Sequence, residues 1–195
     1  LYQDVLAWED LMHICKTTQG IDNTYEKNDM ESRQNIRCMQ MFAGAFMYAA
    51  GNHIGIGYGS CAGMVSGQPI PKPWNGASAN NLFGWGIAHE IGHNMDKLGR
   101  AEITNNLYAL MGQTYDGEQN TLPSRLEKSG KYPAIFTKTA QGWAGESNNV
   151  FVQLGMYWQL HLAYDGGDQP MDFYNRFFKA WKSGQYTKQL EGLSY

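Results

Sequence analysis

The centre of the chain, residues 82–111, reads LFGWGIAHEIGHNMDKLGRAEITNNLYALM. Within it, His89-Glu90-Ile91-Gly92-His93 forms an H-E-x-x-H motif. Helical residues four positions apart share a face, so a helix here would present both imidazoles on one side, where they could bind a single zinc ion. The glutamate of this motif is the residue type that serves as general base. We therefore expect a helix over residues 82–98, ended by Gly99, in a zinc-dependent hydrolase with Glu90 as its base.

The motif needs a third metal ligand, because a catalytic zinc ion takes three protein ligands and one water. The metzincin pattern would place Gly at position 96 and His at position 99, but the chain has Asp96 and Gly99 there. Glu102 lies at the start of a second expected helix, residues 101–111. A tight turn at residues 98–100 would bring Glu102 to the metal. Alternatively, Glu102 is a solvated glutamate that interacts with a helix N-terminus.

The regions around the motif predict an α+β, mostly α fold with a small Gly-rich sheet ahead of the active-site helix. Residues 52–58 alternate glycine with larger residues, which is typical of a strand. His53 and Gly55 lie on this strand, whose glycine face could pair with an extended peptide. Residues 69–81 are rich in Pro, Asn and Gly and predict a loop, on which Trp74 would be exposed. Apolar periodicity predicts further helices over residues 2–16, 33–50, 122–128, 132–142, 149–164 and 170–182.

Length, charge and cysteine content narrow the class of protein. At 195 residues the chain fits one domain, residues 1–195. It begins with Leu1 rather than Met, and we expect a catalytic domain excised from a larger multidomain protein. A net charge of −3 without a basic stripe argues against nucleic-acid binding. No apolar run reaches the roughly 18 residues of a membrane span. An odd cysteine count of 3, widely spaced, predicts buried free thiols.

Two stretches beside the motif carry a family resemblance, GWGIAHEIGHN at residues 84–94 and AEITNNLY at residues 101–108. They resemble the enhancin-like and bacterial mucin-degrading zinc peptidases, which carry H-E-x-x-H followed by a glutamate after a spacer of eight or more residues. That glutamate commonly lies in a T-E-x-T-N-N-I-Y setting, where this chain has Ala101 at the first position. The resemblance extends loosely to GNHIG at residues 51–55 and YWQL at residues 157–160.

The resemblance implies that Glu102 is the third ligand of Zn²⁺, beside His89 and His93, in a thermolysin-like zincin fold of the gluzincin type. It also implies a secreted or cell-surface endopeptidase that cuts mucin-like O-glycoproteins next to a glycosylated Ser or Thr. Two other functions stay open: a zinc peptidase acting on unmodified peptides, and a non-catalytic glycan-binding module. The intact Glu90 favours an enzyme over a binding module.

Further site residues are expected around this centre. Tyr157 and His161, one turn apart on the helix over residues 149–164, are candidate donors to the oxyanion of the tetrahedral intermediate. Asp96 and Asn106 are candidates to fix the imidazole tautomers. The indoles of Trp74 and Trp85 are candidates to contact a sugar of the substrate.

Overall fold

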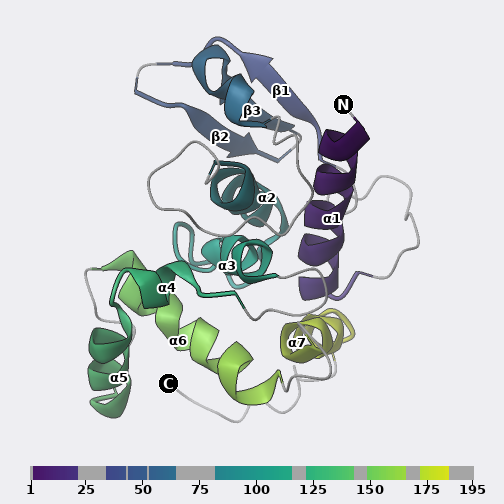
Figure 1. The fold of residues 1–195 in the computed structure, drawn as a ribbon. Coiled ribbons are helices and arrows are strands. Elements are labelled where there is room, and N and C mark those ends of the chain that lie inside the picture. The colour runs from purple at the N-terminus through teal and green to yellow at the C-terminus, as the bar shows by residue number, and fades with distance from the viewer. Residues whose placement is uncertain are drawn as a thin grey trace.

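The computed structural model describes residues 2–21, 34–42, 44–51, 53–64, 82–115, 122–142, 149–165 and 172–184. The fold is α+β and mostly helical, as predicted, with one small sheet at one end of the molecule (Figure 1). The elements in chain order are α1 (Tyr2–Thr18), β1 (Ile36–Met39), β2 (Met47–Ala50), β3 (His53–Gly57), the 3₁₀-helix η1 (Tyr58–Met64), the π-helix η2 (Leu82–Ile87), α2 (Ala88–Met95), α3 (Asn106–Thr114), α4 (Arg125–Lys128), α5 (Tyr132–Ala140), α6 (Val150–Tyr164) and α7 (Asp172–Lys182).

The glycine-rich strand β3 is the centre of the sheet, whose strand order is β1-β3-β2. It pairs in parallel with β1 and antiparallel with β2. Ile54 and Ile56 are buried, whereas Gly55 lies beneath the ring of Tyr48, where an added Cβ would come within 2.1 Å of the ring. The prediction that this strand is open to a peptide is therefore wrong. Instead, β2 has the outer position next to α2 (Figure 1).

The helix predicted over residues 33–50 is also wrong, because β1 and β2 form there. The spacing of the apolar residues in this region is compatible with a helix and also with a strand. Pairing with β3 supplies backbone hydrogen bonds from outside the segment, and such pairing overrides local preference. The other predicted helices form with shifted ends, and only Arg125–Lys128 is helical in the predicted segment 122–128.

Helices α2 and α3 lie in the middle of the molecule, with the sheet on one side and α6 and α7 on the other (Figure 1). Their facing residues, including Ile91, Leu107 and Leu110, are fully buried. Helix α1 runs alongside and is joined to both by Gln19. The Gln19 Nε2 donates to Met95 O at 2.8 Å, and the Tyr108 hydroxyl donates to Gln19 Oε1 at 2.5 Å. Helices α2 and α3 are thus each tied by a hydrogen bond to Gln19 at the end of α1.

Two of the three cysteines contradict the prediction of free thiols. Cys38 of β1 and Cys61 of η1 form a disulfide, because the sheet brings together residues 23 positions apart in sequence. Cys15 on α1 is free and buried, and this burial raises the pKa of its thiol to about 12.

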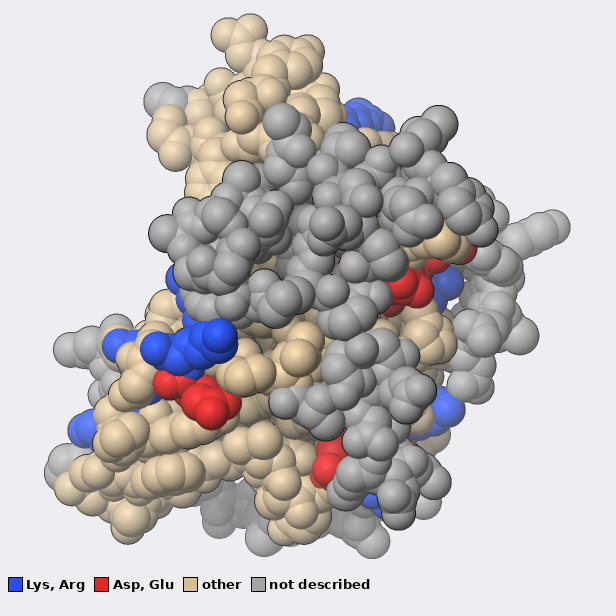
Figure 2. All heavy atoms as spheres, viewed as in Figure 1, with Lys and Arg blue, Asp and Glu red and all other residues tan. Residues whose placement is uncertain are grey.

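The face of the molecule drawn in Figure 2 carries both acidic and basic side chains of the described residues. On the face drawn in Figure 2, their acidic and basic side chains lie in small separate groups rather than in a continuous patch of either sign. Within the described ranges, none of the helices has both the length and the apolar character needed to cross a membrane.

Candidate active site

The helix that carries the motif begins as the π-helix η2 and continues directly into α2. It ends at Met95, three residues earlier than predicted, because Asp96 leaves the helical conformation. The Asp96 carboxylate accepts hydrogen bonds from Leu98 N at 2.9 Å and from Thr104 Oγ1 at 2.5 Å. Asp96, which we expected beside an imidazole, therefore holds the turn between α2 and α3 together.

Glu102 lies in this turn, not in a helix as predicted, because α3 begins only at Asn106. Its φ of 65° makes it the one described non-glycine residue with a positive φ. This left-handed conformation costs roughly 1–2 kcal/mol for an ordinary residue, and such strain occurs preferentially at functional sites. Asn106 Nδ2 donates to Glu102 O at 2.7 Å and supports the conformation.

The turn brings the Glu102 carboxylate against both imidazoles of the motif. Glu102 Oε1 lies 3.1 Å from His93 Nε2, Glu102 Oε2 lies 3.4 Å from His89 Nε2, and the two Nε2 atoms are 3.1 Å apart. One donor atom from each of the three residues lies within 4.8 Å of the others. Two imidazoles and one carboxylate are the donor set of a catalytic zinc site of the His₂Glu type.

The protonation of the cluster also suits a metal. Burial, and then electrostatic interaction with the neighbouring His89, lower the pKa of His93. The neutral imidazole that results is the form that binds a cation. The chemistry of these three residues therefore fits a divalent metal ion.

Two asparagines at the start of α3 contact the histidines, and one of them, Asn106, orients His89. Asn106 Oδ1 lies 2.6 Å from His89 Nδ1, so that Nδ1 donates the hydrogen bond and Nε2 is left facing Glu102. Asn105 is fully buried, and its Nδ2 lies 3.1 Å from His93 Nε2 and 3.3 Å from His89 O. We predicted that Asn106 contacts an imidazole of the motif, but we missed Asn105. Its position next to Asn106 in the sequence was the one feature that could have indicated it.

Gly92 of the motif permits this close approach. A Cβ at this position would come within 2.2 Å of Asn105 O, which is a backbone atom with little room to move. The glycine between the histidines therefore allows α2 to lie directly on the turn that carries the asparagines and Glu102.

Glu90 is separate from the three-residue cluster and has an environment suited to a base. Its side chain is buried, with 7% exposed, and it lines the same cavity as the cluster. Burial, and then the charge of Glu102, raise the pKa of Glu90 to about 7. A carboxyl with such a pKa both accepts and releases a proton near neutral pH.

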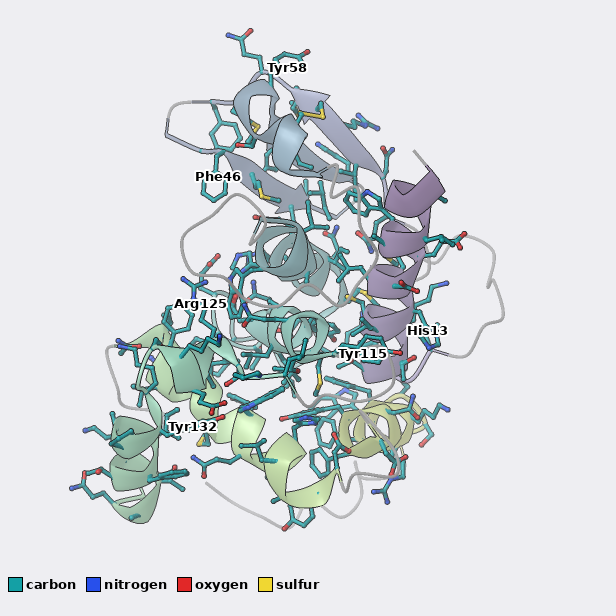
Figure 3. The ribbon with its side chains drawn as sticks, in the orientation of Figure 1. His13, Phe46, Tyr58, Tyr115, Arg125 and Tyr132 are labelled. Carbon is teal, nitrogen blue, oxygen red and sulfur yellow. A yellow bond between two sulfur atoms is a disulfide. The ribbon has the colours of Figure 1, made fainter. Side chains whose placement is uncertain are left out.

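The cavity over the cluster has a volume of about 830 Å³. One wall is formed by β2 and its neighbours, residues 46–49 and 51. The other walls are formed by Trp85 and Gly86 at the start of the motif helix and by Arg125 of α4. In Figure 3, Phe46 and Arg125 lie on the same side of the molecule, one near β2 and the other near α4. Our sequence reasoning missed both residues, because neither lies in a recognisable motif.

Several predicted site residues lie elsewhere. His161 is buried against Trp158, with ring centroids 4.3 Å apart, and its Nδ1 is bonded to Asp165 Oδ2. The carbonyl oxygen of Tyr157 accepts a hydrogen bond from the Tyr174 hydroxyl at 2.6 Å. Neither Tyr157 nor His161 lines the cavity, because this part of α6 packs on α7.

The substrate-binding predictions divide in the same way. Trp85 lines the cavity, whereas His53 lies 2.6 Å from the Tyr48 hydroxyl through its Nε2 and, like Gly55, is not part of the cavity wall. Trp74 lies outside the described residues.

Comparison with known proteins places these features in a family. The model of the family described as "Peptidase M60, enhancin and enhancin-like" matches residues 5–193. Two solved structures, of a functionally unknown conserved protein from Bacillus anthracis strain Ames and of a mutant of it, share the fold with a TM-score of 0.63 each. Their identities to this chain are 24% and 23%.

In each case the match covers 90% of this chain and 34% of the solved one, so the chain spans about a third of the length of these proteins. No protein of curated function matches this chain. Because the family model matches almost the whole chain, the protein belongs to the Peptidase M60, enhancin and enhancin-like family.

Proposed function

We propose that this chain is the catalytic domain of a zinc endopeptidase of the gluzincin type, with His89, His93 and Glu102 as metal ligands and Glu90 as general base. The observation that carries the proposal is the meeting of these three donors within 4.8 Å, in a cavity that Glu90 also lines. A zinc ion bound there would supply a Lewis acid that polarises the scissile carbonyl and makes water more acidic.

The protein's own residues would then move the protons. The Glu90 carboxylate accepts a proton from the attacking water and passes it to the nitrogen of the leaving amine. In the metal-free protein the pKa of Glu90 is raised to about 7, chiefly by burial. Asn106 keeps His89 in the tautomer whose Nε2 faces the other ligands.

The position of β2 favours an extended peptide as substrate. It is the outer strand next to the motif helix, and residues 46–49 line the cavity. A peptide that pairs with this edge would gain main-chain hydrogen bonds and pass across the cluster. This surface replaces the glycine-rich strand that we predicted for the same purpose.

For the substrate class, we propose mucin-like O-glycoproteins cut next to a glycosylated Ser or Thr. The family resemblance supports this, as do the aromatic side chains of Trp85 and Phe46 on the cavity wall. A disulfide between Cys38 and Cys61 favours an oxidising, secreted or cell-surface location.

The test is hydrolysis of one synthetic peptide with and without a single N-acetylgalactosamine on a threonine, followed by mass spectrometry. We expect cleavage of the glycosylated form that a chelator abolishes and added zinc restores. Equal cleavage of both forms would reject the sugar requirement and keep the peptidase. Chelator-resistant cleavage would reject the metal mechanism, and binding without cleavage would favour a glycan-binding module.

A further inference from the structure

Arg125 introduces a positive charge into a cavity whose other ionised side chains are acidic. The described wall of the cavity contains two carboxylates, Glu90 and Glu102, and Arg125 is the sole Lys or Arg along it. In the metal-free cavity these carboxylates disfavour an anionic part of a substrate, and the arginine offsets their effect locally. Arg125 therefore provides, in addition to the proposed metal ion, a place on the described cavity wall that favours a negative charge.

The Arg125 side chain is held in place by aromatic packing. Its guanidinium carbon lies 4.6 Å from the ring centroids of both Trp85 and Phe151, and these two rings are 6.0 Å apart. Such packing holds the guanidinium against the two rings and restricts its rotation. Partial burial lowers the pKa of Arg125, which reflects the loss of water around its charge.

The backbone of Arg125 is fixed as well. Arg125 N donates to Oε1 of the buried Gln113 at 3.0 Å, and Ser124 Oγ accepts from Glu127 N at 3.1 Å and caps α4. A side chain and backbone that are both held before binding lose little conformational freedom when a ligand arrives.

We infer that Arg125, supported by Trp85, forms a subsite for a carboxylate of the substrate at the wall of the cavity. A guanidinium binds a carboxylate through two parallel hydrogen bonds, a geometry that neutral groups do not match. The carboxylate belongs either to an acidic side chain of the peptide or to an acidic sugar attached to it. This inference rests on the proposed peptidase function and adds a specificity to it.

The experiment measures preference for acidic over neutral substrates. In one arm, peptides with blocked ends carry Glu or Gln at successive positions beside the cleaved bond. In the other arm, one O-glycosylated peptide carries either a neutral or an acidic sugar. We expect kcat/KM to be about tenfold or more higher for the acidic member in one arm, which identifies the source of the carboxylate. Absence of a preference in both arms would overturn the inference.

Variants assign the preference to Arg125. We expect Arg125→Gln to abolish the acidic preference and Arg125→Lys to retain a reduced one, because lysine keeps the charge without the two-pronged geometry. Lys128→Gln, an exposed residue of the same helix, is the control for net charge and should keep the full preference. If Arg125→Gln does not fold, Arg125→Lys decides. A wild-type preference in both Arg125 variants, or an equal loss for acidic and neutral substrates, would overturn the inference.

Binding separates this inference from the proposed function. Zinc-loaded Glu90→Gln protein should bind the acidic peptide more tightly than its neutral partner, and Arg125→Gln should remove the difference. If wild-type protein cuts no peptide but shows this binding difference, the peptidase proposal fails and the carboxylate subsite stands. If it cuts peptides without any such difference, the peptidase proposal stands and the carboxylate subsite fails.

Discussion

Glu102 combines two properties at one residue, a left-handed backbone and a carboxylate placed against two imidazoles. Glutamate is poorly suited to a φ of 65°, and glycine would adopt it without strain. We expect Glu102→Ala and Glu102→Gly both to lose most zinc affinity, measured by competition with a chromophoric chelator. Without metal, the free energy of unfolding of Glu102→Gly should be about 1 kcal/mol higher than that of Glu102→Ala, because glycine adopts the positive φ without strain. Zinc affinity equal to wild type in both variants would remove Glu102 from the ligand set.

Glu90 is the second residue whose substitution is decisive. Glu90→Gln should keep one zinc per chain and lose hydrolysis by at least about 100-fold, the usual effect of removing a general base. Metal content by elemental analysis and turnover of the same preparation provide the check. Activity within a few-fold of wild type would reject Glu90 as the base.

The raised pKa of Glu90 also predicts how stability depends on pH in the metal-free protein. The folded pKa is about 7, against an ordinary value of 4.5, so the folded state binds this proton more tightly than the unfolded state. The contribution of protonated Glu90 to the free energy of unfolding is therefore fully present below about pH 4.5 and is lost as the pH rises through 7. In a chelator, Glu90→Gln should therefore gain about 1–3 kcal/mol over wild type between pH 4.5 and pH 8. The free energy of unfolding of both proteins is measured by denaturant titration at each pH. An unchanged difference between the two proteins from about pH 4.5 to pH 8 would contradict this assignment.

At the scale of elements, the contact between α2 and the following turn depends on Gly92. A methyl group there would meet Asn105 O at 2.2 Å, and neither backbone segment can shift without disturbing the ligands it carries. We expect Gly92→Ala to lower the free energy of unfolding by roughly 1–3 kcal/mol and to weaken zinc binding. Gly59→Ala in η1 is the matched control, because an added Cβ meets nothing within 4 Å there. Equal stability of the two variants would disprove the close contact.

At the scale of the whole molecule, the disulfide ties β1 to η1 at the end of the molecule that holds the sheet. Alkylation with iodoacetamide at pH 8 tests this, because Cys15 is buried and its pKa is raised to about 12. The native protein should take up no label. Denaturation without reductant should expose only Cys15, and denaturation with reductant should expose all 3 cysteines. Labelling of Cys38 or Cys61 before reduction would contradict the pairing.

Loss of this disulfide should also reduce stability, because the cross-link limits the unfolded chain over a separation of 23 residues. We expect the double substitution Cys38→Ser and Cys61→Ser to lower the free energy of unfolding by about 3 kcal/mol. Denaturant titration of the variant against the oxidised wild type measures the difference.

Features that depend on spacing along one segment could be predicted from the sequence. The i, i+4 histidines lie on one face of α2, α1 and α5 to α7 follow the apolar periodicity, and the motif with its neighbouring glutamate pointed to the correct family. Other features depend on which segments of the folded chain meet. Strand β3 converted a segment expected to be helical into β1 and β2, and joined Cys38 to Cys61. Packing against α7 turned Tyr157 and His161 away from the cavity, while α4 brought Arg125 into it. Apolar periodicity does not encode these outcomes, because each depends on which parts of the folded chain pair or pack with one another.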